Sequence, residues 1–133
     1  MDTQYVREDF SRQIITWQRI TTENQFCLTN NGMMALDSMA FLSNIEKFKY
    51  WLLAFLNSDV IYCWIKWNVH QYGDTGYRLS NQYVENIPIP MPIPEYEEEI
   101  KYWINTNGNF KIKKLVCEIY GLDSDEIKFI EFR

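Results

Sequence analysis

Residues 54–94 read AFLNSDVIYCWIKWNVHQYGDTGYRLSNQYVENIPIPMPIP, and this stretch decides how the rest of the chain can fold. An apolar helical segment stops at an Asn-Ser-Asp break, and a second, aromatic-rich segment follows it. A polar loop with the single histidine comes next, and prolines then occupy every second position from 88 to 94. Proline lacks an amide donor, so residues 87–94, the proline strap, are expected to follow an extended surface path. The stretch therefore resembles a frame that presents the loop of residues 68–77.

The two helical segments of this frame carry apolar residues at helical spacing. Ser43 and Glu46 form a capping-box pair, which predicts that the first helix begins there. The break at residues 57–59 can cap the second helix. The apolar faces that we expect to enter the core are Ile45, Phe48, Leu52, Phe55 and Leu56 on the first helix, and Val60, Ile61, Trp64 and Ile65 on the second.

The residues before this frame predict a small antiparallel sheet. Residues 1–13 show no period and are interpreted as a linker or as the end of an element that begins earlier. Residues 13–20 and 25–29 are rich in β-branched and apolar side chains, which is typical of strands. Asn30-Asn31-Gly32 predicts a tight turn, because Asn and Gly tolerate positive φ. Residues 33–36 and 39–42 are predicted as a third and a fourth strand.

The residues after the loop predict a helical tail over residues 95–133. Residues 77–79 are expected to form a short strand and residues 80–86 one helical turn. A helix over residues 95–104 follows the strap, and its early glutamates suit the positive end of its dipole. A further helix ends at Gly121, and Asp123 with Glu126 caps a last short helix. The sequence therefore predicts one α+β domain over residues 1–133, with an N-terminal sheet, central helices, the strap and a helical tail.

Composition limits the function classes. The net charge of −5 and pI of about 4.9 speak against a free-standing nucleic-acid binder but leave room for a local basic site. Cys27, Cys63 and Cys117 lie far apart and predict buried, reduced thiols in a cytoplasmic protein, with no metal site. The polar N-terminus and the shortness of the apolar run at residues 51–56 predict neither a secretion signal nor a membrane span.

Catalytic signatures are missing from the sequence, whereas one loop is rich in groups that bind nucleic acids. No nucleophile elbow or glycine-rich phosphate loop occurs, so we expect no independent catalysis. Amide, imidazole and cationic groups can bond base edges or phosphates, and tyrosine rings can stack. The alternative interpretation is an ordinary polar surface loop. The candidate DNA-binding residues are Arg19 on the first strand and Lys66, Asn68, His70, Gln71, Tyr72, Tyr77 and Arg78 in or beside the loop.

Three motifs, in this order and spacing, carry a resemblance to a known family. They are Leu56-Asn57-Ser58, the YVENIPIP segment of residues 83–90, and Tyr120-Gly121-Leu122 followed by an acidic helix. Over most of residues 14–133 the chain resembles the TaqI-like C-terminal specificity domain of adenine-specific DNA methyltransferases and fused type II restriction-modification enzymes. The Ile-Pro repeat before an acidic helix also resembles the end of target-recognition domains in type I specificity subunits.

The resemblance implies a target-recognition module for double-stranded DNA at the C-terminal part of a longer bacterial enzyme. In that family an N-terminal methyltransferase domain binds S-adenosylmethionine and holds the flipped adenine with an Asn-Pro-Pro-Tyr motif. This sequence lacks that motif, so no cofactor is expected within these 133 residues. Recognition residues vary within such a family, so the resemblance assigns no role to a particular side chain. The rival interpretation is a protein-interaction module that docks a partner subunit through its aromatic helices and proline strap.

Overall fold

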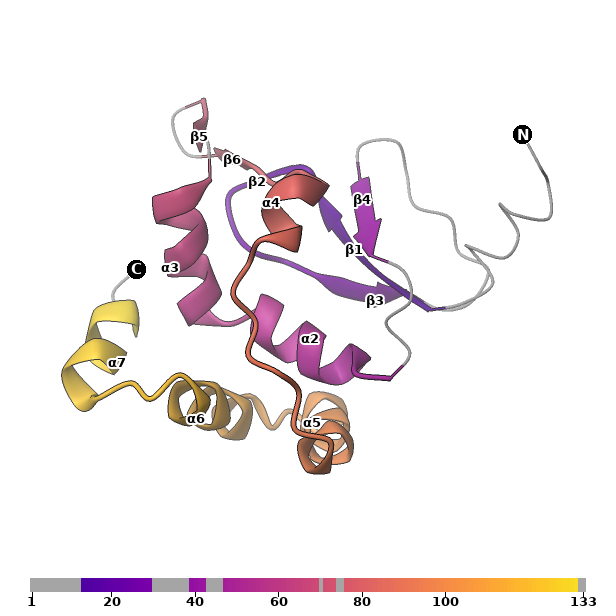
Figure 1. Cartoon of the computed structure of the whole chain (residues 1–133), viewed down its shortest axis with the longest axis vertical. Helices are drawn as coiled ribbons and strands as arrows, with labels where there is room; N and C mark the ends of the chain where they lie inside the picture. Colours follow the sequence, from indigo (N-terminus) through magenta and orange to yellow (C-terminus); the bar gives the residue numbers. More distant parts are fainter. Residues whose placement is uncertain (1–12, 30–38, 43–46, 70, 74–75, 132–133) are drawn as a thin grey trace.

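The computed structural model describes residues 13–29, 39–42, 47–69, 71–73 and 76–131. In the described residues, strands β1 to β4 come first, β5 and β6 lie between helices α3 and α4, and helices make up the rest, so the predicted α+β class is confirmed (Figure 1). The strands are β1 (Ile14–Gln18), β2 (Ile20–Thr21), β3 (Cys27–Thr29), β4 (Met39–Leu42), β5 (Gln71–Tyr72) and β6 (Gly76–Arg78). The helices are α2 (Lys49–Leu56), α3 (Asp59–Asn68), α4 (Asn81–Glu85), α5 (Glu95–Asn105), α6 (Asn109–Ile119) and α7 (Ser124–Glu131).

The strands form two antiparallel sheets instead of the one predicted. The first has the order β3-β1-β4, and the second has the order β2-β6-β5. The predicted strand over residues 13–20 is divided at Arg19, because its end leaves β1 and pairs with β6 instead. The strand predicted at residues 33–36 and the turn at residues 30–32 lie outside the described residues.

The predicted polar loop is largely a β-hairpin, which corrects its description as a loop. Gln71 pairs with Tyr77, and Tyr72 pairs with Gly76. Both β5 and β6 are short, and polar residues surround them, so the sequence pattern resembles a loop more than a strand. The hairpin attaches β5 and β6 to β2, the strand that follows Arg19.

Helix α2 lies between two groups of buried side chains. Leu53 and Leu56 belong to a sheet-side cluster around Trp17, whose ring stacks on Phe26 with centroids 5.3 Å apart. The opposite face belongs to a helix-side cluster, which consists of Trp51, Ala54, Phe55, Ile100, Leu115 and Val116. A helix that is apolar on both faces must be covered on both sides, so α2 is the central element of the fold.

The start of α2 differs from the prediction. Ser43 and Glu46 lie outside the described residues, and the helix begins at Lys49 without a side-chain cap from Phe48. Glu97 of α5 supplies the missing acceptors: its two carboxylate oxygens accept the backbone N–H groups of Tyr50 at 3.0 Å and Trp51 at 2.7 Å. The start of α2 is therefore capped by a carboxylate that is distant in the sequence, which no local sequence pattern could indicate.

The Asn-Ser break between α2 and α3 joins the helices to the sheets. The Asn57 side chain accepts the N–H of Phe26 at 2.7 Å and donates to its carbonyl at 2.9 Å. In return, the buried Asn24 amide donates to the carbonyls of Leu56 at 2.7 Å and Ser58 at 2.9 Å. The Ser58 hydroxyl accepts the N–H of Ile61, which confirms the predicted cap of α3.

The proline strap has no helix or strand over residues 88–93 and is held from inside the fold. The Trp51 indole donates to the Pro90 carbonyl, and the Tyr120 hydroxyl donates to the Pro88 carbonyl, each at 3.0 Å. Burial raises the pKa of Tyr120 to about 12, because the phenolate would lose its hydration. Ile89 packs against both clusters, so the strap ties the helical tail to the rest of the domain.

The end of α6 and the start of α7 lie where the sequence predicts them. Gly121 has φ of 68° after α6, the left-handed conformation that a glycine adopts after a helix. Asp123 and Glu126 exchange side-chain-to-backbone bonds of 2.8 and 3.0 Å, which confirms their capping pair before α7.

The cysteines agree with the prediction of buried thiols only in part. Cys117 is buried. Cys27 is exposed, contrary to prediction, because side chains alternate along the chain here and buried Phe26 precedes it.

Candidate nucleic-acid interface

The exposed face of the second sheet begins at the β2–β6 pair. Ile20 lies directly opposite Arg78, and Thr21 lies opposite Tyr77. Because side chains alternate along a strand, Ile20 and Arg78 share one face while Tyr77 and the following Leu79 share the other. Ile20 and Arg78 are exposed and Leu79 is fully buried, so the face with Arg78 is the outer one.

Arg19 is exposed at the bend between β1 and β2, next to this pair. Its carbonyl accepts the N–H of Leu79, and the Leu79 carbonyl accepts the Trp17 indole N–H at 2.8 Å. These bonds hold the backbone at Arg19 and directly after Arg78. The sheet register therefore brings Arg19 and Arg78, which are far apart in the sequence, to one edge of the fold.

The last turn of α3 adds three exposed side chains, those of Lys66, Trp67 and Asn68. The helix leads through buried Val69 toward β5, so this turn lies at the same end of the molecule as the second sheet (Figure 1). Asn68 donates to the Trp64 carbonyl at 2.8 Å, and Lys66 complements the negative end of the helix dipole. Both residues thus have a structural role in α3 in addition to their candidate role in DNA binding.

The remaining candidate residues divide into three groups. His70 lies outside the described residues. Gln71 and Tyr72 are placed in β5 by their backbone pairing alone. Tyr77 is half-buried and packs against the sheet-side cluster, and burial, followed by the nearby Tyr62, raises its pKa. Tyr77 is therefore mainly a core side chain that supports β6.

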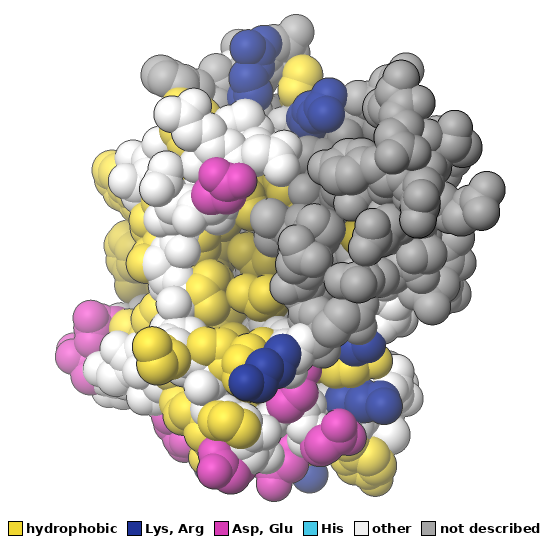
Figure 2. Space-filling model, turned by 45° about the vertical axis from the view of Figure 1, so that its right-hand side comes forward, with side chains coloured by type: hydrophobic (Ala, Val, Ile, Leu, Met, Phe, Trp, Pro, Cys, Tyr) yellow, Lys and Arg dark blue, Asp and Glu magenta, His cyan; other side chains and the backbone are white. Residues whose placement is uncertain are grey.

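We call the set of Arg19, Ile20, Lys66, Trp67, Asn68 and Arg78 the basic end. Residues 60–84 contain Lys66 and Arg78 but only one acidic residue, Asp74, and residues 14–22 contain Arg19 and none. In contrast, α5 contains four glutamates and one lysine. Figure 2 shows most of the acidic side chains of that view at the lower end, mixed with several Lys or Arg side chains, and only one acidic side chain near the two basic ones at the top. Within a chain of net charge −5, residues 14–22 and 60–84 together therefore contain three Lys or Arg residues and one acidic residue.

Sequence reasoning missed two members of the basic end. Trp67 is 76% exposed and Ile20 is 48% exposed, among the most exposed large apolar side chains in the described residues. A signal for Trp67 exists: Ile61 and Ile65 face the core, and Trp67 lies two residues further, on the opposite side of the helix. The exposure of Ile20 could not be predicted from local spacing, because its strand pairs with β6, which lies far along the chain.

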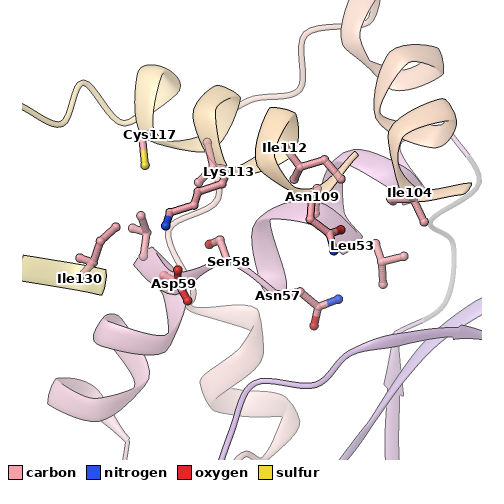
Figure 3. A pocket seen from close by; sticks show the side chains of 13 residues that line it. Leu53, Asn57, Ser58, Asp59, Ile104, Asn109, Ile112, Lys113, Cys117 and Ile130 are labelled. Atoms are coloured by element: carbon pink, nitrogen blue, oxygen red, sulfur yellow. The ribbon is translucent and has the colours of Figure 1, made fainter. Parts of the chain in front are cut away.

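A separate hollow lies away from the basic end, between the α2–α3 break and helices α6 and α7. Its volume is about 450 Å³. Figure 3 shows Asp59 and Lys113 on facing walls, with Lys113 pointing from α6 toward Asp59. Most of the other walls are apolar, from side chains such as Leu53, Ile112 and Ile130. This hollow is a second candidate surface, suited to an apolar group.

The described residues contain no group of His, Cys, Asp and Glu that could hold a metal ion. None of the helices in the described part of the chain is long and apolar enough to cross a membrane. No protein-family model matches this sequence, and comparison with the curated proteins gives no match.

Proposed function

We propose that this protein is a sequence-specific recognition domain for double-stranded DNA, acting for an adenine-specific methyltransferase. The observation that carries the proposal is the basic end, where the bend before β2, strand β6 and the last turn of α3 place three exposed cations at one end of an acidic chain. Arg19, Lys66 and Arg78 would meet phosphates or guanine, and Asn68, His70 and Gln71 would read base edges. The resemblance described above points to the same function.

In this proposal the catalytic work belongs to a methyltransferase domain in another part of the same bacterial, cytoplasmic polypeptide. That domain would bind S-adenosylmethionine and receive the target adenine after it leaves the base stack. The acidic end, where α5 lies, would face away from the DNA, because glutamates repel phosphates. The remaining phosphate affinity of the whole enzyme would come from that other domain.

Salt-dependent binding tests this function. We expect the chain to bind a labelled duplex of mixed sequence at about 20 mM salt, with an affinity that falls steeply as salt rises, because bound cations release counterions. Arg78→Ala should weaken binding about three- to tenfold and lower the salt slope by about one. Fluorescence anisotropy measures both quantities.

The matched control is Lys114→Ala, which removes an exposed cation from α6, far from the second sheet. This variant should bind as the wild type does. If Arg19→Ala, Lys66→Ala and Arg78→Ala all bind like the wild type, the basic end is not the interface. If the wild type shows no salt-dependent binding at all, DNA recognition by this chain is wrong.

A second candidate function, docking of a partner subunit, is favoured by the hollow beside α6 and by the exposed rings of Phe110 and Phe129. The strap contributes less to this candidate than its sequence suggests, because its carbonyls and isoleucines bond and pack within the domain. Binding of a protein through these apolar surfaces would not depend steeply on salt, whereas binding to DNA would.

A further inference from the structure

Trp67 differs from the other tryptophans in how far it is exposed. Of the five tryptophans, Trp17 and Trp51 are buried and Trp64 and Trp103 are partly buried, whereas Trp67 is 76% exposed. The packing of α3 does not need this ring, since Ile61 and Ile65 face the core on the other side of the helix. The described fold therefore leaves this ring accessible to a partner.

The neighbours of Trp67 indicate what that partner is. Lys66 and Asn68 flank it on an exposed turn, and residues 60–73 contain no acidic side chain. Two other exposed rings have acidic neighbours: Tyr102 lies on α5 with its four glutamates, and Phe129 follows Asp125 and Glu126 on α7. Exposed Phe110 on α6 also has lysines nearby and no acidic residue between positions 100 and 117, but it lies outside the basic end. Among these rings, Trp67 alone combines an exposed ring, a neighbouring lysine and a place in the basic end. This combination suits a polyanion that also offers flat apolar surfaces, as nucleic acids do.

From this position we infer that Trp67 stacks on a base that is unpaired or displaced from the helix when the protein binds duplex DNA. Bases inside an intact duplex cover one another, so an indole can reach a base face only where stacking is interrupted. Lys66 and the arginines of the second sheet would hold the backbone beside that point. Exposed Ile20, directly opposite Arg78, offers a second apolar contact there. This inference rests on the proposed function and adds the kind of DNA site that the protein prefers.

The experiment compares a perfect duplex with a duplex of the same sequence that carries one unpaired base. The full chain should bind the second at least about fivefold more tightly, because the indole can stack on the accessible face of the unpaired base. Trp67→Ala should lose this preference and bind the perfect duplex within about twofold of the wild type, because the cations remain. Trp67→Phe should keep part of the preference.

Tyr102→Ala is the matched control, because it removes an exposed ring from the acidic end. It should leave both affinities unchanged. If Arg78→Ala weakens binding but Trp67→Ala keeps the full preference, the inference about Trp67 is wrong while DNA recognition stands. If only a protein partner, and neither duplex, binds the chain through Trp67, both the inference and the proposed function fall.

Discussion

At the scale of single residues, Asn24 has a larger structural role than its place in a short polar turn suggests. It is 6% exposed and donates two hydrogen bonds, to the carbonyls of Leu56 and Ser58. The Leu56 carbonyl ends α2, where the helix itself provides no donor. We expect Asn24→Ala to lower the free energy of unfolding by about 1–3 kcal/mol, because it leaves buried carbonyls without a partner. Urea unfolding followed by circular dichroism measures this loss.

The neighbouring Gln25 provides the control for Asn24. It is exposed, and its side chain bonds only to Glu23 within the described hydrogen bonds. Gln25→Ala should therefore change the free energy of unfolding by less than about 0.5 kcal/mol. Equal losses in the two variants would show that the turn as a whole, and not the amide of Asn24, secures the helix break.

At the scale of elements, α2 depends on a cap that a different helix provides. Glu97 accepts two backbone N–H groups at the start of α2, and it also lies in the first turn of α5. We expect Glu97→Ala to lower the free energy of unfolding by about 1–2 kcal/mol, because both N–H groups lose a charged acceptor. Thermal and urea unfolding both report this change. The free energy of unfolding of Glu97→Gln should lie between those of Glu97→Ala and the wild type.

The control for Glu97 lies one residue away. Glu98 also occupies the first turn of α5 but is exposed, so Glu98→Ala removes the same charge from the same dipole. Its effect should stay below about 0.5 kcal/mol, the size of an exposed charge–dipole interaction. If the two alanine variants unfold at the same urea concentration, the cap of α2 contributes nothing measurable and general helix electrostatics explains both.

These elements also show how far the sequence could predict the fold and the candidate site. Local signals succeeded: the Ser58 cap, Gly121 after α6 and the Asp123–Glu126 pair lie where the pattern predicts them. The start of α2 and the division of the first strand at Arg19 were wrong, because each depends on a partner tens of residues away. The candidate cations were identifiable by type, but only the register of β2 with β6 places Arg19 beside Arg78.

At the scale of the whole molecule, the two buried clusters share α2 and should therefore unfold together. The sheet-side cluster uses Leu53 and Leu56, and the helix-side cluster uses Trp51, Ala54 and Phe55 of the same helix. Phe55 is fully buried and contacts the rings of Trp51 and Tyr120, with centroids 4.7 and 5.6 Å away. Neither cluster is complete without α2, so the sheets and the helical tail are expected to form one cooperative unit.

Fluorine-labelled tryptophan tests this cooperativity, because Trp17 reports on the sheet-side cluster and Trp103 on the helix-side one. In urea, the folded resonances of both should disappear at the same midpoint. Phe55→Leu should lower that midpoint for both by the same amount, with a loss of about 1–3 kcal/mol from the smaller side chain. A variant in which Trp103 unfolds first while Trp17 keeps the wild-type midpoint would show that the helical tail is a separate unit. In that case α2 would belong to the sheets alone, and the strap would be a linker and not a part of one domain.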